Sequence, residues 1–67
     1  MFLIDKIEDE QTRKFSAACY EMNSVNELIN AVEPDREDMN EWGINEDNWF
    51  LAIEYALTQK LHDQEGV

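Results

Sequence analysis

The stretch 45-NEDNWFLAIEYALTQKL-61, from Asn45 to Leu61, decides the fold class of this chain. Asn45 is a favourable helix N-cap, and the run that follows keeps helical periodicity for about four turns without a Gly or Pro. At roughly 100° per residue, one broad apolar face is expected to be core: Trp49, Phe50, Ile53, Ala56, Leu57 and Leu61. The opposite side carries little charge and holds Leu51, Tyr55, Thr58 and His62. We predict a helix over about 46–62 and a frayed tail over 63–67.

The N-terminal third of the chain shows the same periodicity. Apolar and neutral residues recur there at steps of three and four: Ile4, Ile7, Gln11, Phe15, Ala18, Cys19 and Met22. Asp5 and Glu8 have the spacing of a capping box at the start of this stripe, which predicts a helix over about 5–22. Residues 1–4, MFLI, fit a helix, a strand or a loose arm equally well.

Two shorter helices are predicted in the middle of the chain. Ser24 and Glu27 in SVNE form a second capping box, and four apolar residues follow at helical spacing: Val25, Leu28, Ile29 and Val32. They predict a helix over about 24–32. Pro34 suits the first position of a third helix over about 34–42, and Gly43 suits its left-handed cap.

These patterns predict an all-α fold, a small single-domain bundle of three to four short helices over residues 1–67. The chain has no strand-like alternation, internal repeat or Gly/Ser-rich linker. A domain of 67 residues is marginally stable, and its single cysteine cannot close an intrachain disulfide. We therefore expect oligomerisation or a partner to support the fold.

The net charge of the chain excludes several classes of function. The 16 acidic and 5 basic residues give a formal net charge of −11, whereas binding to nucleic acid requires a basic surface. We expect no direct binding to DNA, RNA or anionic membranes. The opening MFLI runs straight into Asp5, which is unlike a signal peptide, and no apolar run reaches membrane-spanning length. With one unpaired cysteine, the expected location is the cytoplasm.

The strongest candidate for a functional surface is the acidic segment EPDREDMNEWGINEDNW, residues 33–49. It contains seven acidic residues and one arginine, which gives a local net charge of −6 over residues 33–47. The seven are Glu33, Asp35, Glu37, Asp38, Glu41, Glu46 and Asp47. Such a concentration of negative charge destabilises the folded chain by self-repulsion, so we expect these acids to serve in binding a basic partner. Trp42, beside these acids, is the expected apolar anchor of the interface, whereas Trp49 is expected in the core.

No motif in the sequence points to catalysis, to a cofactor or to a metal site. The run from Asp38 has Asp, Asn and Gly at the first, third and sixth positions of an EF-hand loop. It has Trp42 and Trp49 at the fifth and twelfth positions, where calcium requires oxygen ligands. Cys19 on the apolar stripe is expected to be a core residue, and His62 a helix-end residue. We expect a protein that is not an enzyme and has no cofactor.

In its small size, its negative charge and its few short helices, the chain is similar to small inhibitors that phages and mobile elements make against host nucleic-acid machinery. This class includes anti-restriction and anti-CRISPR proteins and inhibitors of nucleases or polymerases. The resemblance implies that the acidic face mimics nucleic acid and blocks a basic site on a nucleic-acid-handling protein, in the host cytoplasm if a phage encodes the chain. It concerns the class of protein and assigns no role to any residue.

Two alternatives remain open from the sequence. The chain fits a small subunit, an adaptor or a homodimer whose interface is the reverse of the last helix, at Leu51 and Tyr55. It also fits an antitoxin-like protein that neutralises one basic enzyme. Binding through acids is expected to weaken steeply with salt, whereas an apolar assembly is insensitive to salt.

Overall fold

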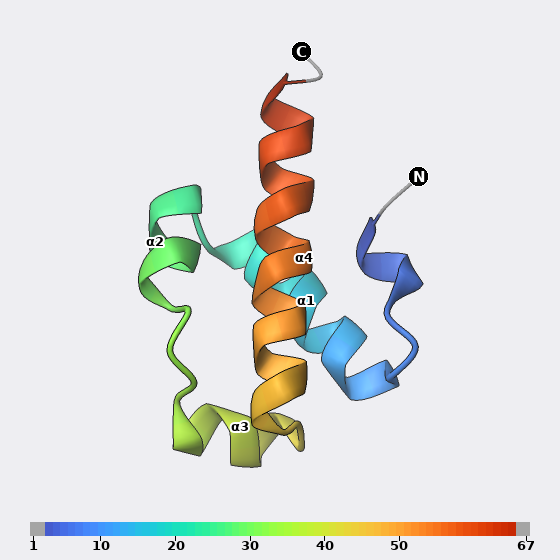
Figure 1. Ribbon diagram of the computed structural model, residues 1–67, viewed down its shortest axis with the longest axis vertical. Coiled ribbons are helices and arrows are strands. Elements are labelled where there is room, and N and C mark those ends of the chain that lie inside the picture. Colours follow the sequence, from blue (N-terminus) through green and yellow to red (C-terminus); the bar gives the residue numbers. More distant parts are fainter. Residues whose placement is uncertain (1–2, 66–67) are drawn as a thin grey trace.

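The computed structural model describes residues 3–65 of the chain, and the side chains of residues 3–64. These residues form a short 3-10 helix and four α-helices, with no strand among them, so the predicted all-α fold is confirmed. The elements in chain order are η1 (Leu3–Lys6), α1 (Glu10–Met22), α2 (Val25–Asn30), α3 (Arg36–Trp42) and α4 (Glu46–Glu65) (Figure 1).

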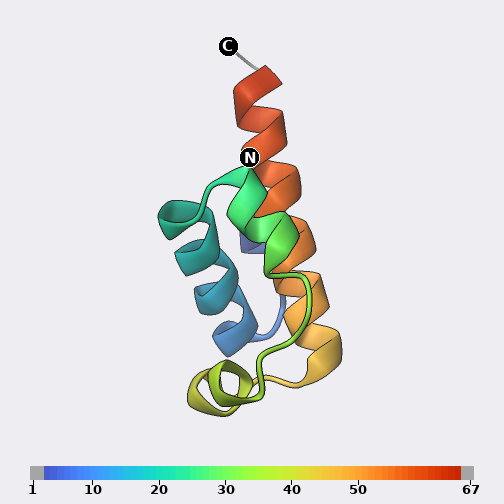
Figure 2. The same ribbon diagram turned by 90° about the vertical axis from the view of Figure 1, so that its left-hand side faces the viewer.

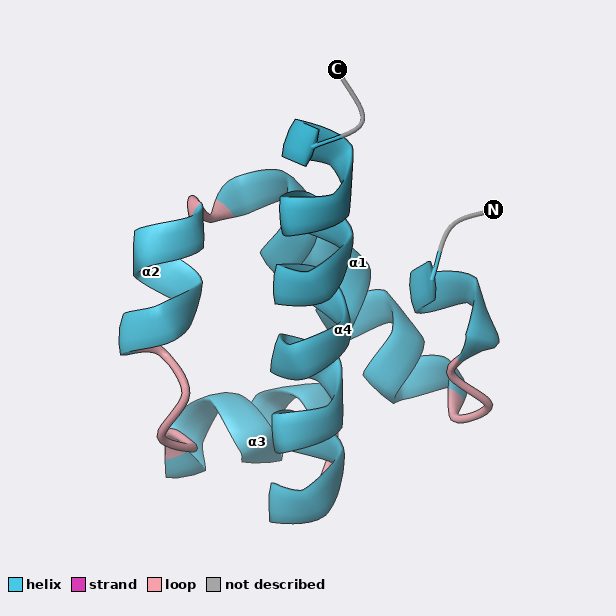
Figure 3. Cartoon of the chain, turned by 45° about the horizontal axis from the view of Figure 1, so that its top comes forward, coloured by secondary structure: helices cyan, strands magenta, loops and turns pink. Residues whose placement is uncertain are grey.

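Helix α4 is the central element, and every other element packs around it or at its end. It runs along the longest dimension of a molecule that measures 36 × 24 × 17 Å. Helix α1 makes the most extensive contact with α4, and η1 and α2 pack on α4 as well. Figures 2 and 3 show α3 lying across the end of the molecule where α4 begins. None of the described helices is long and apolar enough to cross a lipid bilayer.

Small side chains allow α1 and α4 to approach closely. Thr12 and Ser16 on α1 and Ala52 and Ala56 on α4 are fully buried. The Ser16 hydroxyl donates a hydrogen bond of 2.7 Å to the backbone carbonyl of Ala52. No buried polar side-chain atom among the described residues lacks a hydrogen-bond partner. A buried hydroxyl between these helices is therefore compatible with a stable core.

The predicted start of the first helix is wrong. Asp9, rather than Asp5, is the N-cap of α1, and its carboxylate accepts hydrogen bonds from the Thr12 backbone N–H at 2.9 Å and the Thr12 hydroxyl at 2.7 Å. These bonds lower the pKa of Asp9. The break before Asp9 lets η1 fold back onto α4, where Ile4 and Ile7 are buried. Leu3 and Ile4 belong to η1, and residues 1–2 lie outside the described part of the chain.

Local capping predictions for the other helices are confirmed, but two predicted bounds are wrong: α2 ends at Asn30 rather than near 32, and α3 begins at Arg36 rather than at Pro34. Ser24 and Glu27 form the reciprocal capping box of α2, and Gly43 caps α3 in the left-handed conformation with φ 69°. The Asn45 side chain accepts a hydrogen bond of 2.8 Å from the Asn48 backbone N–H at the start of α4. Pro34 precedes the N-cap of α3, Asp35, instead of occupying the first helical position.

The buried face of α4 differs from the predicted face. Trp49, Ile53 and Ala56 are buried as predicted, but Phe50 and Leu61 are 41% and 43% exposed. The buried stripe instead continues through Ala52 and Gln59: Trp49, Ala52, Ile53, Ala56 and Gln59. The reason is tertiary, because α1 and η1 pack against the side of α4 that carries the small alanines.

Two other predicted apolar faces are also only partly buried. On α2, Leu28 is fully buried whereas Ile29 is 53% exposed. On α1, Met22 is 80% exposed and Gln11 is exposed. These side chains lie on faces of α1 and α2 that no described element covers.

Helix α4 continues three residues beyond the predicted end at 62. Asp63 accepts hydrogen bonds from the Tyr20 hydroxyl and, at 2.9 Å, from the Gln59 side-chain amide. These contacts to α1 and to the preceding turn hold the last turn of α4, which ends at Glu65. The rest of the predicted frayed tail, residues 66–67, lies outside the described residues.

Candidate partner-binding surface

The acidic residues predicted to bind a partner gather at the α3 end of the molecule. Six of them lie on or next to α3 and in the first turn of α4, and Glu33 lies in the loop between α2 and α3. All are exposed except Asp38, which is half-buried: Glu33, Asp35, Glu37, Glu41, Glu46 and Asp47. We call this set, with Asp38, the acidic end.

Among the described residues, no carboxylate of the acidic end has a recorded ion pair. Among the residues that the structure describes, the recorded ion pair is Lys14 with Glu10 at 3.4 Å, on α1. Asp35 accepts hydrogen bonds from the backbone N–H groups of Glu37 at 2.9 Å and Asp38 at 3.5 Å. Its charge therefore also stabilises the N-terminus of α3.

The outer side of α3 presents acids at the spacing of one helical turn. Glu37 and Glu41 are four residues apart and both exposed, which puts them on one face. The inner side of the helix carries Met39 and Trp42, which are half-buried and pack against the core. This division fixes the direction in which α3 points its charges.

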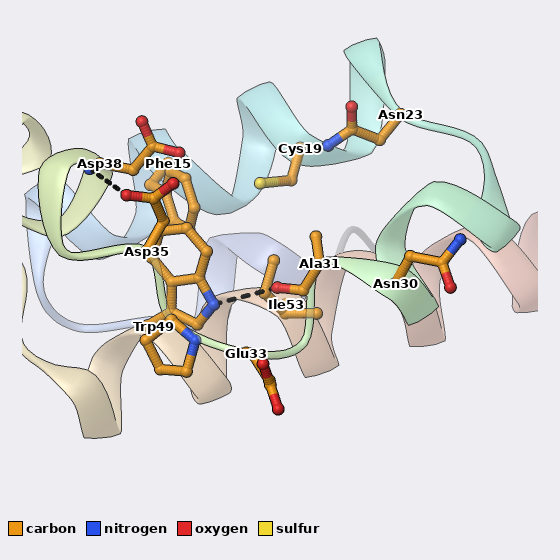
Figure 4. Close-up of a pocket in the computed structure, with 11 residues that line it drawn as sticks. Phe15, Cys19, Asn23, Asn30, Ala31, Glu33, Asp35, Asp38, Trp49 and Ile53 are labelled. Atoms are coloured by element: carbon orange, nitrogen blue, oxygen red, sulfur yellow. Dashed lines mark hydrogen bonds between the residues drawn. The ribbon is translucent and has the colours of Figure 1, made fainter.

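A pocket of about 610 Å³ opens beside the acidic end. Asp35, Asp38 and Glu33 line it together with Phe15 and Trp49 (Figure 4). In this view the Glu33 carboxylate points away from Asp35 and Asp38. The pocket thus places carboxylates beside two buried aromatic side chains, and the carboxylates suit a cationic group such as a guanidinium.

Cys19 lines the same pocket from α1. It is 7% exposed, as expected for a core residue. Burial, and to a smaller extent the negative charge of Asp38, raises the pKa of its thiol to about 11. The thiol therefore stays protonated at neutral pH, and this side chain contributes apolar surface rather than a nucleophile.

The two tryptophans have different environments. Trp49 is buried, its ring centroid lies 4.7 Å from that of Phe15, and its indole N–H donates to the Ala31 carbonyl at 3.2 Å. Trp42, the predicted anchor, is half-buried with its ring centroid 5.3 Å from Phe15. Trp42 thus packs against the core while remaining partly exposed, next in sequence to Glu41.

The alternative interface predicted on the reverse of α4 is partly covered. Leu51 and Tyr55 are half-buried and pack against the core. Both line a shallow depression with Lys6 and Ile7 from the N-terminal segment. Because the N-terminal segment takes up part of this face, Leu51 and Tyr55 offer less free apolar surface than their sequence pattern indicated.

The segment with partial EF-hand spacing is helical. Asp38 and Asn40 lie within α3, and Gly43 ends that helix, so this run does not form a calcium-binding loop. Within residues 3–64, no group of three or more His, Cys, Asp or Glu side chains is arranged to hold a metal ion.

The sequence indicated the acids of this surface but not the apolar half of the pocket. Phe15 and Cys19 come from α1, far from residues 33–47 in the chain, and Ile53 comes from α4. Each was expected only as a core residue, since no local motif links it to the acids. Their position beside Asp35 and Asp38 depends on how α1 and α4 pack.

Comparison of the chain with family models, with curated proteins and with solved structures found no match.

Proposed function

We propose that the chain is a non-catalytic inhibitor of the phage or mobile-element type. Its acidic end occupies a basic, nucleic-acid-binding site on a partner protein in the cytoplasm and blocks that site by mimicking nucleic acid. The observation that carries the proposal is the set of seven carboxylates around α3 that pair with no cation among the described residues.

The physical basis of the proposal is charge complementarity. A site built for phosphates presents Lys and Arg side chains, which attract exposed carboxylates held on short helices. Binding would also relieve the self-repulsion of the acidic end, because the partner's cations neutralise it. At about 0.15 M salt the Debye length is roughly 8 Å, so the attraction is screened by added salt.

The pocket beside α3 supports a specific contact within this mechanism. An arginine of the partner that enters the pocket would meet Asp35 and Asp38. Guanidinium groups form bidentate bonds with carboxylates. Trp42, exposed in part beside these acids, would supply apolar contact at the centre of the interface.

Affinity capture tests the proposal. The tagged protein is incubated with nuclease-treated lysate of its source cell or host, then washed at low and at high salt, and each fraction is identified by mass spectrometry. We expect a basic nucleic-acid-binding protein that is retained at low salt and released at high salt. Recovery of the chain alone, or of a partner indifferent to salt, would instead favour a subunit, adaptor or homodimer role.

Two matched charge-reversal variants separate the acidic end from net charge. The test variant carries Glu37→Lys, Glu41→Lys and Glu46→Lys, and the control carries Glu8→Lys, Glu10→Lys and Glu21→Lys. All six positions are exposed, and both variants change the net charge from −11 to −5. We expect the test variant to lose the partner and the control to keep it. Equal loss in both would mean that net charge, and not this surface, drives binding.

A further inference from the structure

Exposed apolar side chains concentrate on a different face of the molecule, between α2 and α4. A groove of about 410 Å³ there is lined by Ile29, Val32, Phe50 and Leu57. Ile29 is 53% exposed, Val32 46% and Phe50 41%. Such a contiguous apolar surface is unusual on a small soluble domain and is typical of an interaction site. It includes none of the seven carboxylates of the acidic end.

The spacing of the exposed apolar side chains along α4 suits a bound helix. Phe50, Leu57 and Leu61 recur along α4 at intervals of seven and four residues, which puts them on one stripe. At a rise of about 1.5 Å per residue, this stripe is about 16 Å long, or roughly three turns of a bound helix. Ile29 on α2 and Val32 in the loop that follows it form the opposite wall. A partner helix with apolar residues at i, i+3, i+4 and i+7 would fit between the two walls.

The charges around the groove select the occupant. Glu54 lines the groove between Phe50 and Leu57, and Glu33 follows Val32 directly. Glu46 lies one turn before Phe50 on the same face of α4. The described lining contains no Lys or Arg. A second copy of this chain would bring the same acids and another net charge of −11 to the contact, which repulsion disfavours.

We infer that the groove between α2 and α4 docks a cationic amphipathic helix of a partner protein. Its apolar stripe contacts Ile29, Val32, Phe50 and Leu57, and its flanking Lys or Arg side chains approach Glu54 and the neighbouring acids. The lining of the groove contains no residue of the acidic end, although the flanking Glu33 and Glu46 belong to that set. The apolar contacts at Ile29 and Phe50 therefore do not depend on the proposed function.

Titration with synthetic peptides tests the inference. The ligand is a 14-residue helix of Leu and Lys with its leucines on one face, and the control peptide has the same composition in scrambled order. Binding is measured by calorimetry and by methyl chemical shifts. We expect the amphipathic peptide to bind at least tenfold more tightly than the scrambled one and to shift the methyl signals of Ile29, Val32 and Leu57. Equal binding of the two peptides would overturn the inference.

Substitution of Phe50 separates apolar docking from simple charge attraction. Phe50→Asp adds a negative charge, so a peptide held by charge alone would bind as well or better. A peptide held in the groove is expected to bind at least tenfold more weakly. Ile29→Ser, on the opposite wall, is expected to weaken binding without changing the charge. Met22→Asp, at an exposed apolar position outside the groove, is the matched control and should change the affinity less than twofold.

The oligomeric state of the chain tests whether a second copy, rather than a partner helix, covers the groove. Sedimentation of the chain alone over a range of concentrations is expected to show a monomer. A dimer that Phe50→Asp dissociates would show that a second copy covers the groove and would overturn the inference. Circular dichroism of each variant verifies that it is folded.

Discussion

Leu28 and Ile29 are neighbours on α2 with opposite environments, and their substitution tests the orientation of that helix. Leu28 has no exposed surface, whereas Ile29 is 53% exposed. Leu28 is also the one buried residue of α2. The structure therefore predicts that Leu28→Ala is strongly destabilising and that Ile29→Ala is not.

The magnitude follows from burial and cavity formation. Leu28→Ala removes three buried carbons, which at about 0.8 kcal/mol each gives about 2.4 kcal/mol of lost transfer free energy. A cavity adds to this loss, but the groove beside Leu28 leaves room for partial collapse, so we expect a total of about 2.5–3.5 kcal/mol. A domain of this length has about 3–10 kcal/mol of stability. Ile29→Ala is expected to cost less than about 1 kcal/mol, because Ala has the higher helix propensity and the site is half exposed.

Thermal unfolding followed by circular dichroism measures both effects. About 4–8 °C of Tm shift per kcal/mol gives a decrease of about 10–28 °C for Leu28→Ala and less than about 8 °C for Ile29→Ala. Similar decreases for the two variants would refute the reasoning, because they would mean that α2 presents a different face to α4. Urea unfolding at 25 °C gives the same comparison as a free energy.

Three further predictions concern single sites. Gly43→Ala is expected to cost about 1 kcal/mol and to lower Tm by about 4–8 °C, because φ is 69° at this position. The cost comes from the backbone alone, since no atom lies within 4 Å of the added Cβ. Gly43→Asn should cost less, and equal stability of all three proteins would contradict the prediction. Cys19, with its pKa of about 11, is expected to react slowly with iodoacetamide at pH 8 in the native protein and fast in denaturant. Asp38→Asn should speed only the native reaction, and equal native and denatured rates would contradict the burial of the thiol. The hydrogen bonds from the Tyr20 hydroxyl and, to a smaller extent, Gln59 lower the pKa of Asp63 from its ordinary value of 3.8, so Tyr20→Phe is expected to raise that pKa in an NMR titration. The same bond raises the pKa of Tyr20 from 10.0, so the stability lost in Tyr20→Phe should be greatest between about pH 4 and 10, shrinking as pH falls through the pKa of Asp63 or rises through that of Tyr20. An unchanged Asp63 pKa in the variant would mean that this bond does not form in solution.

The candidate surface was predictable as far as its chemistry depends on residue type. The seven acids, their excess over Arg36 and their neighbour Trp42 are visible in the sequence. Their exposure and their distribution over α3, the adjoining loop and the first turn of α4 required the structure. The groove at Phe50 was not predictable, because periodicity alone assigned that side chain to the core.

By itself, the sequence determined the helical class, the net charge and the helix ends that local caps specify. Caps such as Ser24, Asn45 and Gly43 act on backbone groups within three or four positions, so local sequence is enough to specify them. Even the misplaced start of α1 has a local explanation in Asp9 and Thr12.

Only the tertiary structure decided which side of each helix is buried. The Ser16 hydroxyl reaches the Ala52 carbonyl across 36 positions, and the Leu3 backbone N–H reaches the Gln59 side chain across 56. These contacts turn α4 so that its small residues face α1 and η1, which leaves Phe50 and Leu61 exposed. An amphipathic pattern states that a helix has an apolar side. How much of that side becomes core depends on the other helices that pack against it, and local sequence does not specify which helices those are.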